Sequence, residues 1–82
     1  MLESSVQSKI IAHLKKQGWF VLKIIKANIN GVPDIIAFRN GETVFIEVKN
    51  ETGKQSEIQK YVQKQIEAQG FKYILARKIQ DL

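Results

Sequence analysis

Apolar residues recur along the chain with two periods, and the period separates helices from strands. Within residues 4–17, Val6, Ile10 and Leu14 follow at intervals of four, which places them on one face of a helix. A second helix is predicted over residues 56–69 from a similar stripe. Shorter runs rich in β-branched and aromatic residues are typical of strands, and these are residues 19–25, 34–39, 43–49 and 71–76.

The element order α-β-β-β-α-β predicts an α/β fold with a mixed central sheet flanked by helices. A chain of 82 residues corresponds to one domain, residues 1–82. Residues 19–25 form a nearly continuous apolar run, which indicates a strand in a sheet covered on both faces. Residues 77–82 are expected to form a short peripheral tail.

Asn40-Gly41 separates two of the predicted strands and is a strong signal for a tight hairpin, because a type I′ turn needs positive φ at both positions. A turn centred there sets Asp34 opposite Glu47. Directly opposed residues have Cβ atoms roughly 4.5–5.5 Å apart, and like charges at that distance are destabilising. Lys49 lies two residues beyond Glu47 and projects from the same face of the strand. The pattern therefore predicts a metal site with a positioned cation.

The residue types favour one class of ion and one class of partner. Carboxylate oxygens without cysteine or clustered histidine favour Mg²⁺ or Mn²⁺ and make zinc improbable. Thirteen Lys and Arg against eight Asp and Glu give a net charge of +5, which favours a polyanion. Cations and amide donors precede the predicted hairpin, where they would contact phosphates. The candidate nucleic-acid-binding residues are Lys23, Lys26, Asn28, Asn30 and Lys54.

Two residues near helix starts have alternative interpretations. A capping box of Ser4 with Gln7 would leave Glu3 outside the first helix, whereas a start at Leu2 would place Glu3 on its first turn, facing the site. Gln59 has the spacing of a second capping box, and its amide could instead be directed at the site. The sequence leaves both alternatives open.

Pro33-Asp34 followed by Glu47-Val48-Lys49 resembles the motif of the PD-(D/E)XK nuclease superfamily. With Gly-Val-Pro-Asp before the first hairpin strand, Phe-Ile-Glu-Val-Lys in the second and Gly-Lys-Gln-Ser-Glu-Ile-Gln opening the following helix, the chain is most similar to small stand-alone VRR-Nuc domains, which are often found in phages. The similarity extends from Glu3 to about Leu75.

The resemblance implies a restriction-endonuclease-like αβββαβ core and a metal-dependent DNA endonuclease that acts on branched DNA such as four-way junctions. It implies that Asp34, Glu47 and the carbonyl of Val48 hold the metal. The residues it makes catalytic are Glu3, Asp34, Glu47, Lys49 and Gln59. It also implies a homodimer, in agreement with the small size of a chain that has no disulfide.

Two other functions remain open: a non-catalytic DNA-binding module on the same scaffold, and an RNA-processing nuclease. A purely structural ion network would explain neither the basic excess nor the Gly-Val-Pro-Asp loop. No apolar run approaches the roughly 18 residues of a membrane span, and the acidic N-terminus is unlike a signal peptide. We therefore expect a cytoplasmic protein, in the host cell if it is phage-encoded.

Overall fold

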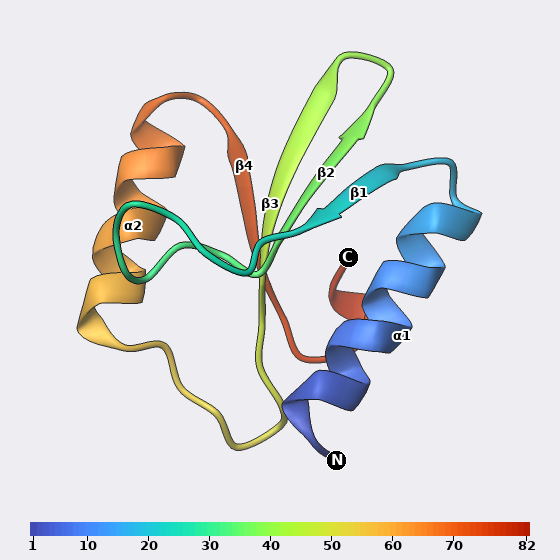
Figure 1. Cartoon of the computed structure of the whole chain (residues 1–82), viewed down its shortest axis with the longest axis horizontal. Helices are drawn as coiled ribbons and strands as arrows, with labels where there is room; N and C mark the ends of the chain where they lie inside the picture. The colour runs from blue at the N-terminus through green and yellow to red at the C-terminus, as the bar shows by residue number, and fades with distance from the viewer.

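The computed structural model describes residues 1–82 and shows a four-stranded sheet with one helix against each face (Figure 1). The elements are α1 (Glu3–Lys16), β1 (Phe20–Lys23), β2 (Ile35–Arg39), β3 (Glu42–Val48), α2 (Glu57–Ala68), β4 (Lys72–Ala76) and a 3₁₀ turn, η1 (Ile79–Asp81). The strand order is β1-β2-β3-β4; the first three strands are antiparallel, and β4 runs parallel to β3. The predicted α/β class and mixed sheet are confirmed.

The hairpin between β2 and β3 forms at the predicted turn. Asn40 and Gly41 have φ angles of 49° and 81°, the positive values that a type I′ turn needs. The register runs from Arg39 opposite Glu42 to Ile35 opposite Ile46. The turn therefore sets the pairing of the whole hairpin.

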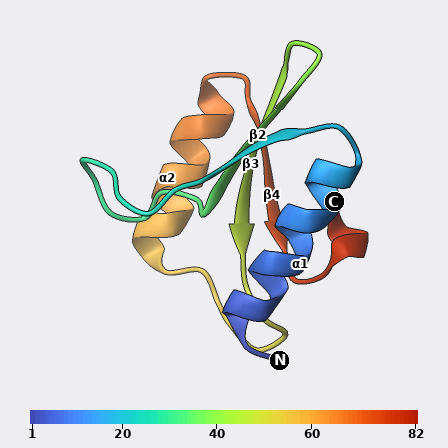
Figure 2. The same ribbon diagram turned by 45° about the vertical axis from the view of Figure 1, so that its right-hand side comes forward.

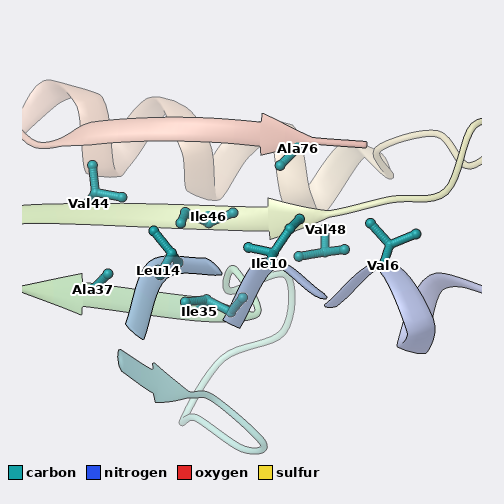
Figure 3. Close-up of a cluster of buried hydrophobic side chains, with 9 residues drawn as sticks. All are labelled: Val6, Ile10, Leu14, Ile35, Ala37, Val44, Ile46, Val48 and Ala76. Carbon is teal, nitrogen blue, oxygen red and sulfur yellow. The ribbon is translucent and has the colours of Figure 1, made fainter. Parts of the chain in front are cut away.

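The main hydrophobic core lies between α1 and the sheet. Val6, Ile10 and Leu14 are buried and point at the strands, as Figure 3 shows. They pack against side chains from alternate positions of the strands, which are Ile35, Ala37, Val44, Ile46, Val48 and Ala76. Alternation sends the remaining side chains of β2 and β3 to the other face, where α2 packs.

The loop between β1 and β2 runs across α2, as both views show (Figure 1, Figure 2). Gly31 makes this approach possible: its φ is +82°, and a Cβ there would lie 3.0 Å from the backbone of Ile58. A side chain at this position would push the loop away from the helix.

The expectation that residues 19–25 are covered on both faces is wrong. β1 spans only four residues at the sheet edge; Phe20 is 64% exposed and Ile25 87% exposed. The physical reason is the placement of the helices: α1 contacts β1 on one face, whereas α2 contacts β4 and leaves the other face of β1 without a covering helix. Val21 therefore packs against the core, while Phe20 and Leu22 form surface.

The two chain ends also differ from expectation. α1 begins at Glu3, with Leu2 at the N-cap and no side-chain cap, so the capping box of Ser4 with Gln7 does not form. The C-terminal tail is not peripheral, because Ile79 and Leu82 pack against the core. No helix in the structure is both long and apolar enough to cross a membrane.

Candidate active site

Asp34 is held in place by the backbone on both sides of it. One step beyond the pair of Ile35 and Ile46, the register sets Asp34 opposite Glu47. The backbone N–H of Ile24 donates to the Asp34 carbonyl at 2.8 Å, and the N–H of Val48 donates to Oδ2 of Asp34 at 2.8 Å. The carboxylate thus occupies a fixed position beside the end of β3.

Glu47 is a buried carboxyl group with one oxygen that has no partner. The residue is 1% exposed, and its Oε1 forms no hydrogen bond. Its Oε2 accepts from the Gln59 amide at 3.0 Å and lies 3.5 Å from the Lys49 ammonium. Burial is the main cause that raises the pKa of Glu47 to about 7; the charge of Asp34 raises it further, and Lys49 opposes the shift. The site therefore disfavours a second negative charge unless a cation enters.

The backbone of Val48 is directed to the side of β3 on which Asp34 lies. The N–H of Lys49 donates to Ala76 on β4 at 3.0 Å, so the backbone groups of Val48 point to the opposite edge, where Asp34 receives the Val48 N–H. The residue opposite Val48 in the extended register is Pro33, which has no N–H to donate. The proline therefore leaves this carbonyl without a strand partner.

These groups fit a hard divalent cation. Two carboxylates and a carbonyl are the ligands that Mg²⁺ and Mn²⁺ prefer. The unpartnered Oε1 of Glu47 is the observation in favour, because buried polar atoms normally find a partner. No three Asp, Glu, His or Cys side chains lie close enough to bind a metal by themselves. A metal here would therefore depend on the Val48 carbonyl and on water for its other ligands.

Gln59 forms both of the interactions that the sequence left open, the capping box of α2 and a contact with the site. It forms the capping box of α2: its Oε1 accepts from the Ser56 N–H at 2.9 Å, and its own N–H donates to Oγ of Ser56 at 3.2 Å. The same amide donates through Nε2 to Glu47. The cap orients the amide, and the amide orients the carboxyl group.

Glu3 lies on the first turn of α1, half-buried, as the alternative helix start predicts. Its charge contributes to the raised pKa of Glu47, although less than burial and Asp34 do. The N-terminal ends of both helices and the carboxyl end of β3 lie at the same end of the sheet (Figure 2). Glu3 is therefore within electrostatic range of the site without hydrogen bonding to it.

The structure divides the candidate DNA-binding residues into two groups. Lys26 and Asn30 line a hollow of about 350 Å³ together with Asp34 and Gln59. Lys23, Asn28 and Lys54 are exposed and do not line it. Lys23 pairs with Ile35, whose side chain belongs to the core under α1, and paired residues share a face, so Lys23 lies on the α1 face and Glu47 on the other.

Sequence reasoning missed Tyr73, which is buried on the α2 face. Its hydroxyl group accepts from the Gln55 amide at 3.2 Å, and burial raises the pKa of Tyr73 to about 12, with smaller contributions from Glu47 and Asp34. The alternation of β4 could have placed Tyr73 on a face. Only the parallel register, which pairs it with Phe45, shows that this is the face of Glu47.

Comparison with known proteins agrees with the observed fold. The family model described as archaeal Holliday junction resolvase (Hjc) matches residues 4–80. A solved structure titled "VRR_NUC domain" superposes with a TM-score of 0.85 at 22% sequence identity, covering 95% of this chain and 86% of that chain. No curated protein sequence matches the chain. The resemblance and the fold class inferred from the sequence are confirmed.

Proposed function

Because the chain belongs to the archaeal Holliday junction resolvase family, we propose that it is a nuclease that hydrolyses phosphodiester bonds in DNA. We further propose that it requires Mg²⁺ or Mn²⁺ and prefers branched DNA such as a four-way junction. The observation that carries the proposal is the buried Glu47 carboxyl group. This group has a raised pKa and one oxygen without a partner, and it lies beside the carboxylate of Asp34 and the ammonium of Lys49.

The residues divide the proposed chemistry among them. Asp34, Glu47 and the carbonyl of Val48 would hold a divalent ion, which when bound polarises a phosphoryl oxygen and makes the attacking water more acidic. Lys49 would orient that water and offset the negative charge that grows on the phosphate. Gln59 would keep one oxygen of Glu47 engaged, so that the other faces the ion. This arrangement accounts for both acids and the amine.

Glu3 is the third acidic residue of the proposed site. It is too far from the other acids to form a three-residue cluster, yet its charge influences Glu47. We propose that Glu3 holds a second ion or a bridging water when DNA is bound. Substitution of Glu3 should therefore reduce cleavage less than substitution of Glu47.

DNA would approach over the loop between β1 and β2. Lys26 and Asn30 line the same hollow as Asp34 and would contact the strand that is cut. Lys23, Asn28 and Lys54 would contact more distant phosphates. The net charge of +5 supports salt-dependent binding. We expect the protein to work in the cytoplasm, because its proposed substrate lies there.

A homodimer would cover the exposed apolar residues of β1 and β2. Phe20, Leu22 and Phe38 are exposed, and the two phenylalanine rings lie 6.2 Å apart. We name these three residues the β1–β2 apolar surface. Two copies related by a two-fold axis would bury it and direct two sites at two strands of a junction.

The test is cleavage of linear, flapped and four-way DNA, with single-stranded RNA alongside, in Mg²⁺, in Mn²⁺ and in EDTA. We expect metal-dependent cleavage that is fastest on four-way DNA and is abolished by Glu47→Gln, while Glu42→Gln, an exposed acid on the same strand, keeps it. Equal rates on linear and four-way DNA would remove the junction preference. Binding without cleavage would support the non-catalytic module, and cleavage of RNA alone would support the RNA nuclease.

A further inference from the structure

A short turn follows Lys49 and closes on itself. The side-chain Oδ1 of Asn50 accepts from the N–H groups of Thr52 at 3.2 Å and Gly53 at 2.8 Å. We call residues Asn50 to Gly53 the Lys49 turn. Because the Asn50 side chain bonds to backbone N–H groups two and three residues further on, the four residues of the turn are fixed relative to one another.

This turn packs directly on the aliphatic stem of Lys49. A Cβ placed on Gly53 would lie 3.2 Å from Oδ1 of Asn50 and 3.3 Å from Cδ of Lys49, so a side chain there would press on both. The Lys49 side chain is 12% exposed, and its ammonium lies 3.5 Å from Oε2 of Glu47. Lysine has several rotatable bonds, and covering the stem restricts them.

Arg77, the residue after the end of β4, contacts both ends of the turn. Its Nη1 donates to the carbonyl of Asn50 at 2.7 Å and to the carbonyl of Gly53 at 2.6 Å. The guanidinium group forms no ion pair with any carboxylate. The residue before it, Ala76, accepts the N–H of Lys49 at 3.0 Å. The end of β4 thus fixes the backbone of Lys49 directly and its stem through the turn.

We propose that Arg77 is a positioning residue for the reaction: through the Lys49 turn it holds the Lys49 ammonium against Glu47. The proposal rests on the proposed function of Lys49 in cleavage. Arg77 does not contact the site itself, since its hydrogen bonds go to the turn. Charge-assisted hydrogen bonds to two carbonyls give it the directionality that this role needs.

The first test compares Arg77→Gln with Lys78→Gln, which removes the same charge from the next, exposed residue. Under single-turnover conditions, Arg77→Gln should lower the cleavage rate about tenfold or more, because small misplacements of a catalytic group are costly. Its Kd for four-way DNA should stay within about twofold of wild type, as expected when positioning rather than binding is lost. Arg77→Lys, which keeps the charge and the donors, should recover part of the rate, and Lys78→Gln should keep all of it.

A second test does not depend on activity. NMR of protein with ¹³C-labelled lysine, with the Lys49 ε-methylene signal identified from Lys49→Arg, should show a shifted and sharpened signal for Lys49 in Arg77→Gln. Gly53→Ala keeps the Arg77 side chain and adds a methyl group against Oδ1 of Asn50 and the Lys49 stem, so it should shift the same signal. If the wild type does not cleave DNA and these shifts appear, the positioning stands while the proposed function fails. An unchanged Lys49 signal in both variants, or a loss of DNA binding as large as the loss of rate, would overturn the proposal.

Discussion

Replacing Glu47 with glutamine should stabilise the metal-free protein at neutral and alkaline pH. The folded-state pKa of Glu47 is about 7, against an ordinary value of 4.5, and burial is the main cause. A raised carboxyl pKa means that the folded state binds the proton more tightly than the unfolded state does. The stability associated with the neutral form is fully present below pH 4.5 and is lost as the pH rises through 7.

The size of the effect follows from that shift. One pKa unit corresponds to about 1.4 kcal/mol, so the shift sets an upper limit of about 3 kcal/mol at pH 8. The glutamine amide occupies the position of Oε1, which has no partner, and an unpartnered buried donor costs about 1–3 kcal/mol. The difference is a net gain of up to about 2 kcal/mol. In a domain of this size that raises Tm by up to roughly 15 °C.

The assay is thermal unfolding in EDTA between pH 4.5 and pH 8.5 for wild type, Glu47→Gln and Glu42→Gln. The difference in Tm between Glu47→Gln and wild type should increase as the pH rises and level off above about pH 7. Glu42→Gln should show no such pH-dependent difference from wild type, because Glu42 is exposed. Adding Mg²⁺ or Mn²⁺ at pH 8 should raise the Tm of the wild type and not that of Glu47→Gln. A gap that is constant with pH, or a less stable Glu47→Gln at pH 8, would refute the reasoning.

Lys49→Ala should keep DNA binding and lower the cleavage rate by about 10²–10³, as measured by single-turnover kinetics and filter binding; a normal rate with weak binding would make Lys49 a phosphate contact only. Gly31→Ala should destabilise the protein by at least about 1 kcal/mol more than Gly41→Ala in thermal unfolding, because both have positive φ but only Gly31 faces a neighbour, Ile58, at 3.0 Å. Equal losses would show that the contact with α2 is unimportant. Phe20→Ser should convert a dimer to a monomer in light scattering, and a wild type that is already monomeric at micromolar concentration would contradict the dimer.

The hairpin and the placement of its charged residues could be predicted from the sequence because they depend on local rules. The turn at Asn40-Gly41 sets the register, and the register brings Asp34 and Glu47 together across the hairpin. The two-residue period of a strand then directs Lys49 to the same face. Each step depends on neighbours in one strand or across one tight turn, so the sequence determines it without knowledge of the rest of the fold.

Gln59 marks the boundary of what sequence reasoning could reach. Its capping box with Ser56 is local and could be recognised from the spacing of the two residues. Its hydrogen bond to Glu47 depends on where α2 packs against the sheet, and many side chains together decide that. The burial that raises the pKa of Glu47 also depends on where α2 packs, because the residue pattern of a strand does not show how deeply each of its side chains is covered.

Other features were decided by tertiary structure alone. α2 leaves one face of β1 uncovered, so part of an apolar run expected in the interior became surface. The chain end folds back on the core, which brings Arg77 to the turn after Lys49, although 24 residues separate Arg77 from Gly53. The physical reason is the same in each case: these contacts join segments far apart in the chain, and their free energy depends on the packing of whole elements rather than on the residue pattern of any one of them.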